Sequence, residues 1–420
     1  MFLLAAPGPR TSPLLRLCSA QPPGAVPASF ATVPASASAW AVALGPLVGR
    51  KVLRSSRSRA SRVKAAESES AATVGDDAKF LAELQKRVQE VNAQLEVRRE
   101  RIDRNWRRGR AKAQPAVIIQ DDWVRRVALS GDEVFVGTAS SGIRRHVLGA
   151  VEARQVFRVQ GSPSRMVPAD HQAQADPETS ITSMAWNGRY LCAGLAGGRL
   201  QVWNEEAWLI LDRSVDTRPC YVCVHDDVLV AAAGDSVMCW DVKNLEDLPL
   251  CKIQASCRVH CLAPAFEDSI ILGLADGSVE LRQLRRLSLS ARRAAAHGAP
   301  VSAAAVDATG PGRLVTGDDA GRVKCWEMNE KMPGEDWTLR WTRSDHKGRI
   351  VAIQRGGGGS VLTAALDGRI IAWDAETGEF VFNIPNHKVW LGSMCLSEEQ
   401  DLLVTDGRDN AVYLYNFAEE

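Results

Sequence analysis

A nine-residue stretch, LDGRIIAWD at residues 366–374, recurs in altered form along much of the chain. It combines a tight-turn signal with alternating apolar residues and an aromatic anchor. The corresponding anchor positions are Trp203, Trp240, Arg282, Trp326, Trp373 and Tyr415. Successive anchors lie 37, 42, 44, 47 and 42 residues apart. A period of this size is typical of small structural units that stack into an array.

Each repeated unit contains short runs of strand-forming residues between turn signals. Around residue 366 these runs are IVAIQ, SVLTAAL, RIIAWD and EFVFNI. Asp276-Gly277 and Asp367-Gly368 lie between a second and a third run, where a tight hairpin requires positive φ. The sequence therefore predicts four-stranded antiparallel sheets. Seven units begin near Val124, Ile181, Pro219, Val259, Val301, Ile350 and Leu391.

These anchors, turns and strands resemble the WD-repeat family of β-propellers, and the resemblance covers residues 115–420. It implies an all-β fold, a seven-bladed β-propeller of four-stranded antiparallel blades. In that family a hydrogen-bond chain joins a His before the first strand, a second-strand hydroxyl, a turn Asp and the Trp. The resemblance implies this chain in blade six at His346, Thr363, Asp367 and Trp373. In blade seven it implies His387, Thr405 and Asp409, with Tyr415 in place of Trp.

The family pattern is incomplete in the other blades. Blade five has Ala320 where the Asp belongs, although it keeps His297, Thr316 and Trp326. Asp318 and Asp319 lie at the neighbouring turn, where we expect solvated carboxylates. Blade four has Arg282 where the Trp belongs. Because each missing hydrogen bond removes about 1 kcal/mol, we expect the early blades to depend more on apolar packing. These network residues are expected to be structural, not catalytic.

The last blade lacks a strand of its own. The run AVYLYNF is a third strand, and only three residues follow it. Residues 115–120, PAVIIQ, precede the first blade and have the composition of the missing outer strand. We therefore expect strand 115–120 to close the propeller of residues 115–420, since closure removes an exposed sheet edge.

The N-terminal segment has the composition of a targeting peptide. Residues 1–66 contain nine Lys or Arg and no Asp or Glu. Val63, Ala65 and Ala66 resemble a chloroplast processing site, so we expect a plastid transit peptide, with the mitochondrion as second choice. The plastid stroma or the thylakoid surface is then the expected location. The apolar run of 14 residues at positions 36–49 is too short to span a bilayer, and no transmembrane segment is expected.

Residues 67–114 are expected to be a linker followed by a basic amphipathic helix. Residues 77–108 lack Gly and Pro, and one apolar stripe contains Phe80, Leu84, Val88, Val91, Leu95 and Ile102. Residues 98–112 carry eight basic and two acidic groups, whereas residues 115–420 carry 31 basic and 41 acidic groups. The helix could pack on the acidic propeller, dock a partner helix as a coiled coil, or bind RNA or an anionic membrane.

Two cysteine clusters have spacings seen in metal sites. They are Cys220 with Cys223, and Cys257 with His260 and Cys261. Both fall on expected first strands, where residues three apart point to opposite faces. We therefore favour buried structural cysteines over a zinc or redox site, and we expect no metal.

The sequence contains no recognisable catalytic or cofactor motif. RGGGGS at residues 355–360 has no following helix to receive a phosphate, and it reads as a flexible hairpin loop. We therefore predict no catalytic residue, no cofactor and no enzymatic activity. The leading hypothesis is a protein-interaction scaffold that assembles or stabilises a multiprotein complex in the plastid. The alternative is an organelle RNA- or ribosome-associated assembly factor that binds through residues 98–112.

One ring of residues is predicted to bind partners. The residue just before each first strand should lie at the channel mouth, and Trp and Arg are over-represented among interface hot spots. The candidates are Trp123, Arg218, Arg258, Arg349 and Trp390, with Arg218 uncertain by one place. An Arg-rich mouth on an acidic propeller suits an acidic or phosphorylated segment of a partner protein. Burial of the Trp side chains and solvation of the Arg side chains is the alternative.

Overall fold

The computed structural model describes residues 70–419 except 120–121, 140–141, 151, 162–176, 246–247, 267, 308–311, 329–336, 385–390, 398 and 407–410. All side chains discussed below belong to one compact unit, Glu83–Glu420. The targeting segment and the side chains of residues 70–82 lie outside this description.

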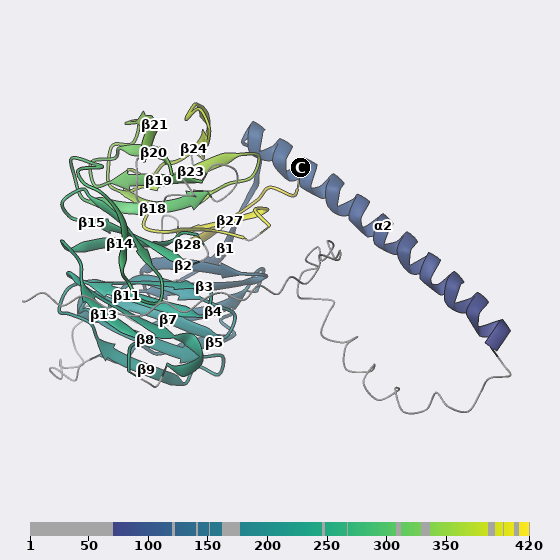
Figure 1. Ribbon diagram of the computed structural model, residues 1–420, viewed down its shortest axis with the longest axis horizontal. Coiled ribbons are helices and arrows are strands. Elements are labelled where there is room, and N and C mark those ends of the chain that lie inside the picture. Colours follow the sequence, from purple (N-terminus) through teal and green to yellow (C-terminus); the bar gives the residue numbers. More distant parts are fainter. Residues whose placement is uncertain are drawn as a thin grey trace, which may run out of the picture. The chain divides into compact units, whose positions relative to one another are not determined.

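The described strands form seven four-stranded antiparallel sheets, which confirms the predicted seven-bladed fold (Figure 1). Blade one contains β2 (Val124–Ser130), β3 (Glu133–Thr138), β4 (Ile143–Val147) and β5 (Gln155–Phe157). Blade two contains β6 (Ile181–Trp186), β7 (Tyr190–Leu195), β8 (Arg199–Asn204) and β9 (Leu209–Ser214). Blade three contains β10 (Cys220–His225), β11 (Val228–Ala233), β12 (Ser236–Asp241) and β13 (Cys251–Gln254).

The next three blades repeat this order. Blade four contains β14 (Val259–Pro264), β15 (Ser269–Leu274), β16 (Val279–Gln283) and β17 (Leu289–Arg293). Blade five contains β18 (Val301–Asp307), β19 (Arg313–Asp318), β20 (Val323–Glu327) and β21 (Thr338–Arg343). Blade six contains β22 (Ile350–Arg355), β23 (Ser360–Ala365), β24 (Ile370–Asp374) and β25 (Phe380–Ile384). Two short 3-10 helices, η1 (Pro177–Thr179) and η2 (Val242–Asn244), precede β6 and follow β12.

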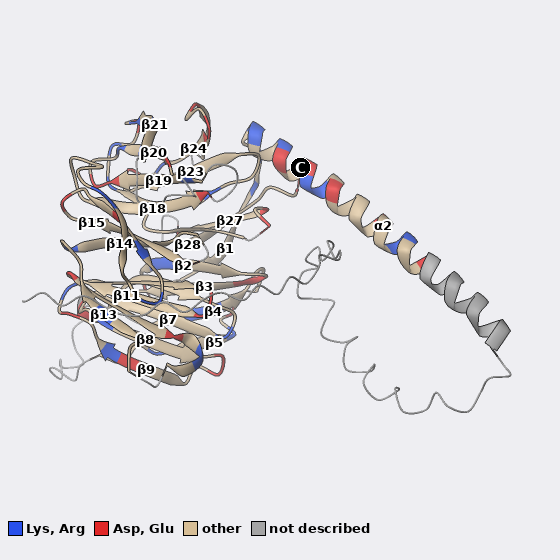
Figure 2. Cartoon of the chain, viewed as in Figure 1, with Lys and Arg blue, Asp and Glu red and all other residues tan. Residues whose placement is uncertain are grey.

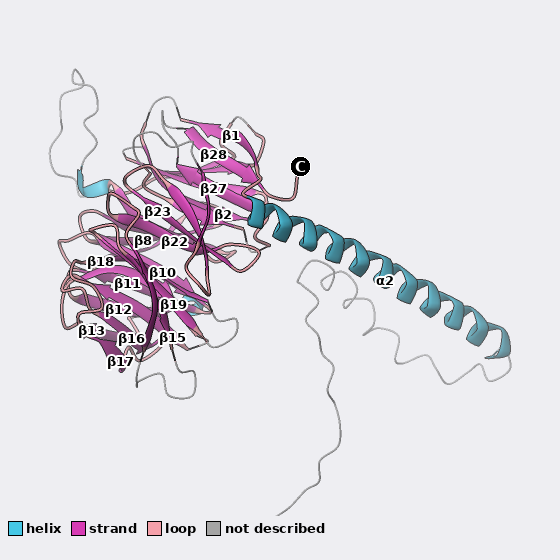
Figure 3. Cartoon of the chain, turned by 90° about the horizontal axis from the view of Figure 1, so that it is seen from above, coloured by secondary structure: helices cyan, strands magenta, loops and turns pink. Residues whose placement is uncertain are grey.

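Blade seven is built from both ends of the propeller sequence. It contains β26 (Met394–Leu396), β27 (Leu402–Asp406), β28 (Ala411–Asn416) and, as its outer strand, β1 (Lys112–Ile118). Strand β1 is antiparallel to β28, with Lys112 opposite Asn416 and Ile118 opposite Ala411 (Figure 3). The closing strand thus begins three residues earlier than the expected run 115–120 and ends at Ile118, and its register shifts between Pro115 and Val117.

The innermost strands of neighbouring blades contact one another in the order β2, β6, β10, β14, β18, β22 and β26, and β26 contacts β2 again. Small residues on the second strands allow this approach. A Cβ atom at Gly194 would lie 2.1 Å from the carbonyl oxygen of Cys220 in the next blade. Gly277 and Gly368 both have φ of +79°, as the predicted hairpins require.

The hydrophobic core is divided into layers between neighbouring blades. Trp203, Trp240 and Trp373 are almost fully buried in these layers. Cys220 lies in the layer between blades two and three, and Cys223 lies in the layer between blades three and four. The two thiols therefore lie on opposite faces of β10, as the alternation of strand residues requires.

Helix α2 (Ser70–Arg108) precedes the closing strand. It begins seven residues earlier than the expected helix, and both end at residue 108. Gly109 stops the helix because its φ of +61° is left-handed and a Cβ atom there would lie 2.7 Å from Phe382. Figure 2 shows basic and acidic residues alternating along the described part of α2.

Candidate interaction surfaces

Blade six contains the hydrogen-bond chain implied by the family resemblance. His346 Nε2 lies 2.8 Å from the Thr363 hydroxyl, which accepts a hydrogen bond from Trp373 Nε1 at 2.8 Å. The other ring nitrogen of His346 lies 3.4 Å from both Asp367 carboxylate oxygens. Burial lowers the pKa of His346. The chain of contacts fixes the first, second and third strands against one another.

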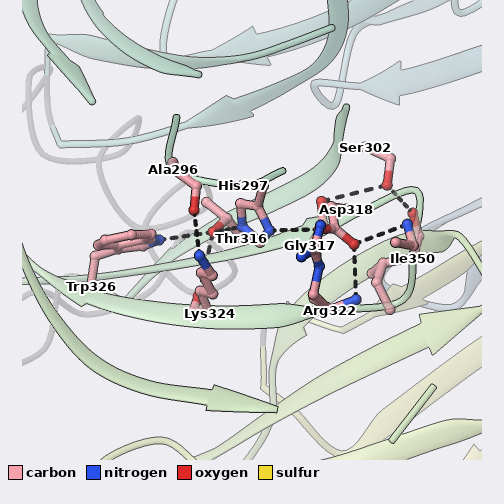
Figure 4. Close-up of polar contacts among 11 residues, drawn as sticks. Ala296, His297, Ser302, Thr316, Gly317, Asp318, Arg322, Lys324, Trp326 and Ile350 are labelled. Carbon is pink, nitrogen blue, oxygen red and sulfur yellow. Dashed lines mark hydrogen bonds and ion pairs between the residues drawn. The ribbon is translucent and has the colours of Figure 1, made fainter. Parts of the chain in front are cut away.

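Blade five closes the same network with a different acid, which corrects the expectation that Asp318 is solvated. Figure 4 shows His297 between Thr316 and Asp318, and its Nδ1 lies 3.0 Å from Asp318 Oδ2. Asp318 is fully buried and also accepts a hydrogen bond from Arg322 Nε at 2.8 Å. The carboxylate reaches His297 from the end of β19, two residues before Ala320, so the network is complete without the turn Asp.

Blade four has a buried ion pair at the position of the missing Trp. Arg282 Nε donates to Glu280 at 2.8 Å, and Arg282 Nη1 donates to the carbonyl of Leu287 at 2.7 Å. Ser256 donates a further hydrogen bond to Glu280. Because Glu280 is 1% exposed, these partners compensate its desolvation.

In blade seven, His387 and Asp409 lie outside the described residues, and Thr405 is buried. Asp406 follows Thr405 at the end of β27 and accepts hydrogen bonds from the backbone N–H groups of Gly392 (2.8 Å) and Ser393 (2.7 Å). Burial raises the pKa of Asp406 to about 6, and these hydrogen bonds only partly oppose that effect. Asp406 thus ties the first and second strands of the last blade together.

The C-terminal third of α2 is anchored on the propeller through Trp106. This side chain is fully buried and stacks on Phe417, with ring centroids 3.8 Å apart. Its Nε1 donates to the carbonyl of Gln400 at 2.7 Å, and Asn105 Nδ2 donates to the carbonyl of Phe417 at 2.8 Å. Ile102 joins the same core layer between blades six and seven.

The glycine-rich turn joins β22 to β23 as the predicted hairpin, but it packs against Trp106 and is therefore not the flexible loop that was expected. A Cβ atom at Gly357 would lie 2.3 Å from Trp106 Cδ1, and one at Gly356 would lie 3.0 Å from the same ring. The backbone N–H of Gly358 donates to Asp103 at 3.0 Å. The absence of side chains at this turn therefore makes room for the helix.

Two basic residues of the segment 98–112 form ion pairs with the propeller. Arg98 pairs with Asp401 at 2.5 Å and with Glu399 at 3.1 Å, and Lys112 pairs with Glu419 at 2.8 Å. All eight basic residues of this segment are exposed: Arg98, Arg99, Arg101, Arg104, Arg107, Arg108, Arg110 and Lys112. The helix therefore packs on the acidic propeller at one end while keeping most of its cationic surface open.

The N-terminal part of the described helix leaves its apolar face uncovered. Four side chains, named here the arm stripe, are between 47% and 54% exposed: Leu84, Val88, Val91 and Leu95. Spacings of four, three and four residues place them on the helix face that also bears Ile102 and Trp106. One end of this face is buried against the propeller, and no described residue covers the other end.

The predicted mouth residues differ in their exposure. Trp123, Arg218 and Arg258 are exposed, whereas Arg349 is half-buried and lies 3.2 Å from Asp319. Strand β10 begins at Cys220, so Pro219 precedes it and Arg218 is one residue too early. Trp390 lies outside the described residues. Partner binding at this mouth stays a prediction.

The first strands enclose a central cavity of about 530 Å³. Arg349 is the one predicted mouth residue among its described lining residues, which also include Arg126, Tyr221 and His260. Sequence reasoning missed Arg126. A Val-Arg-Arg-Val run in a first strand was the available signal, because strand alternation turns one of its two arginines inward.

Neither cysteine cluster forms a metal site in the part of the chain that is described. No group of three or more His, Cys, Asp or Glu residues is arranged to hold a metal there. Burial raises the pKa of the Cys220, Cys223 and Cys261 thiols to about 12. Among the described segments, no helix is both long enough and apolar enough to cross a bilayer.

Comparisons with known proteins support the fold more than a specific function. No protein-family model matches the chain. The chain is 30% identical over 73 residues to eukaryotic translation initiation factor 3 subunit I of Vanderwaltozyma polyspora, a match that spans 17% of this chain and 21% of that protein. The crystal structure of the computationally designed Ika8 protein aligns with a TM-score of 0.51 and 19% identity over 72% of this chain and 99% of that one. Together with the seven blades, these likenesses support a propeller of the WD40 type.

Proposed function

We propose that the chain is a WD-repeat scaffold without catalytic activity that assembles a multiprotein complex inside a plastid. The observation that carries this proposal is the uncovered arm stripe on a helix whose other end is fixed to the propeller. Residues 83–97 of α2, named here the arm, present that stripe. A fixed helix loses little conformational entropy when a partner binds. A smaller part of the free energy gained from its apolar contacts is therefore lost to ordering, and the affinity is higher than for a flexible helix.

The partner that fits the arm is an amphipathic helix. Covering a half-exposed Leu or Val stabilises a complex by about 1 kcal/mol, so the four residues of the arm stripe could contribute roughly 4 kcal/mol. A helix presents apolar residues at the matching spacing of three and four and buries them against this face. The exposed stripe therefore favours helix-on-helix docking.

The charges beside the stripe restrict which helix fits. The immediately flanking residues contain one cation and three amides and no carboxylate: Gln85, Arg87, Asn92 and Gln94. The next turn adds Arg99 and Arg101, both exposed. A second copy of this chain would bring the same flanking positions without a carboxylate, and its Glu83 and Glu90 pair with Arg87 and Lys86 of their own helix. We therefore assign the arm to a different protein, whose helix carries acidic residues beside its apolar face.

Two synthetic helical peptides test this assignment on the full chain. Both carry the same Leu core of four heptads, and one has Glu at all flanking positions whereas the other has Lys. We expect the Glu peptide to bind at least about tenfold more tightly, a difference of about 1.4 kcal/mol, by fluorescence anisotropy at 0.1 M salt. Equal affinities for the two peptides would show that the partner helix need not be acidic. If the chain alone sediments as a dimer, the arm instead binds a second copy of the chain.

A matched pair of variants locates the binding face. Leu84→Gln, Val88→Gln and Leu95→Gln together should abolish binding of the Glu peptide while the melting temperature of the propeller stays unchanged, because these half-exposed side chains are not part of the core layer that holds the helix. The control is Lys86→Ala with Gln89→Ala on the opposite face of the helix. If the control loses binding equally, the stripe is not the docking surface.

A second candidate function is RNA binding by an organelle assembly factor. The exposed arginines of residues 98–112 favour it, and the short match to a translation initiation factor subunit is compatible with it. Neutralising Arg104, Arg107 and Arg108 should then weaken RNA binding and reduce the dependence of log Kd on log salt by nearly three. If the slope of log Kd against log salt does not change, the three arginines do not contact RNA and are simply exposed to solvent.

The plastid location is supported by the composition of residues 1–66. Import into isolated plastids and into isolated mitochondria, each followed by protease treatment, tests it directly. Processing near Ala66 by plastids alone is the expected result. Protection in mitochondria alone would reverse the assignment.

A further inference from the structure

The central cavity has a described lining without any carboxylate. Its volume of about 530 Å³ is within the range of about 300–1,000 Å³ typical of small-molecule sites. The described lining contains two arginines, one histidine and several hydroxyl groups, and none of these residues is Asp or Glu. Such a lining favours an anion over a cation.

Arg126 of β2 is held in place by neutral groups. Its Nε donates to the carbonyl of Thr182 at 2.5 Å, and its Nη1 donates to the carbonyls of Arg125 and Gly392, both at 2.8 Å. Within the described chain, Nη2 makes no hydrogen bond and the guanidinium forms no ion pair. Carbonyl groups thus fix the orientation of the cation without neutralising it.

Asp406 lies near Arg126, but its carboxylate accepts hydrogen bonds from backbone N–H groups and makes none with Arg126. Gly392 separates the two groups, because its carbonyl accepts from Arg126 and its N–H donates to Asp406. The carboxylate also accepts from the N–H of Ser393. Asp406 therefore moderates the field of Arg126 while leaving Nη2 available.

Two further groups face the same cavity from other blades. Arg349 lines it from the start of β22 and keeps Asp319 at 3.2 Å from its Nε. His260 lines it from β14, and its Nδ1 is a buried atom without a hydrogen-bond partner in the described chain. An unpaired ring nitrogen in such a place costs free energy unless a ligand satisfies it.

We propose that this cavity binds a phosphate-type oxyanion on Arg126, Arg349 and His260. A guanidinium offers paired N–H donors that match the oxygens of phosphate, and charge-assisted hydrogen bonds of this kind are about twice as strong as neutral ones. The His260 ring supplies a third donor when Nδ1 carries its proton. The three residues line one cavity from blades one, four and six.

The cavity has room for more than the anion. The remaining volume would hold the organic group that carries the phosphate, either a small molecule or a phosphorylated side chain that enters through the mouth. The chemistry recognised is the same for both sources. This proposal does not depend on the arm, so variants of the arm stripe should leave it untouched.

Calorimetric titration of the full chain with inorganic phosphate tests the site. We expect binding with a Kd of about 1 mM or tighter. Arg349→Gln and His260→Gln should each raise that Kd at least about threefold, and Arg126→Lys should raise it about tenfold because the guanidinium geometry is lost. The matched control is Arg213→Gln, an exposed arginine on the outer strand β9 that does not line the cavity.

The outcomes separate the possibilities. Absence of phosphate binding up to about 10 mM overturns the proposal, as does equal weakening by Arg213→Gln, which would indicate diffuse charge attraction. Melting curves identify any variant that fails to fold, and Arg349→Gln and His260→Gln decide the question if Arg126→Lys unfolds. A phosphoserine peptide that binds more tightly than phosphate assigns the anion to a protein partner. An unphosphorylated peptide that binds equally well overturns the site.

Discussion

Trp106 of α2 stacks on Phe417 with ring centroids 3.8 Å apart and an angle of 7° between the ring planes, although the two residues lie at opposite ends of the propeller sequence. The same indole donates a hydrogen bond to the carbonyl of Gln400. This contact makes the helix part of the propeller core instead of a tethered appendage.

Loss of the indole should be costly. Trp106→Ala removes a fully buried side chain, so we expect the free energy of unfolding to fall by about 3 kcal/mol and the helix to become sensitive to protease. Gly357→Ala should also destabilise the protein, because its Cβ atom would lie 2.3 Å from Trp106 Cδ1. In the Trp106→Ala background Gly357→Ala should cost almost nothing. Additive effects of the two changes would contradict this contact.

The hydroxyl of Thr316 should matter through two hydrogen bonds. It lies 2.7 Å from His297 Nε2 and accepts from Trp326 Nε1 at 2.9 Å. Thr316→Val leaves both buried groups unsatisfied, so we expect a loss of about 2 kcal/mol in urea denaturation. Thr338→Val on the exposed side of the same blade is the control and should change stability by less than about 0.5 kcal/mol.

Asp406 should give the protein an unusual pH dependence. Its pKa in the folded protein is about 6, raised by burial above the ordinary value of 3.8. The folded state therefore favours the protonated form, and the contribution of Asp406 to stability increases as pH falls from about 7 toward 4. Asp406→Asn should remove this contribution, on the order of 3 kcal/mol across the range. The measurement is the difference between wild-type and variant denaturation curves at each pH, and a difference that does not change with pH would refute the assignment.

The closing strand should control solubility. A chain that begins at Arg110 keeps β1, whereas a chain that begins at Trp123 leaves one edge of β28 unpaired. We expect the first to elute as a monomer in size-exclusion chromatography and the second to aggregate, because an open strand edge pairs with other chains. Identical elution of both would mean that another segment covers β28.

The buried cysteines should be inert. Burial raises the pKa of Cys220, Cys223 and Cys261 to about 12, so almost no thiolate forms at pH 8. We expect a thiol reagent to modify the partly exposed Cys251 and Cys257 much faster than these three, as measured by mass spectrometry. Stoichiometric zinc binding at pH 7 would contradict the structural role.

The repeat was visible in the sequence because each blade needs the same local features. A turn glycine with positive φ and a buried anchor are required by the geometry of one sheet, so the same residue types recur at a fixed period. The blade count and the closing strand followed from that period. The bounds of the closing strand did not, because Lys112 and Ala113 pair with β28 through backbone groups that carry no side-chain signal.

Some features of the structure could not be predicted from the sequence. They involve residues that take over one another's role, or residues that are far apart in the sequence but in contact in the fold. Asp318 takes the place of the turn Asp from two residues away, which only the packed geometry reveals. Trp106 and Gly357 are 251 positions apart, and neither predicts the other. The bulge between Val124 and Arg126 likewise decides which arginine of β2 enters the cavity, and bulges leave little trace in sequence.

The two strands that complete the ring are separated by residues 119–410. During synthesis, β1 leaves the ribosome long before its partner exists, because the edge that it covers belongs to the last strand of the propeller. No product that stops before β28 can therefore complete the ring, however well its individual blades form. Pairing of β1 with β28 thus requires that the whole propeller sequence has been translated.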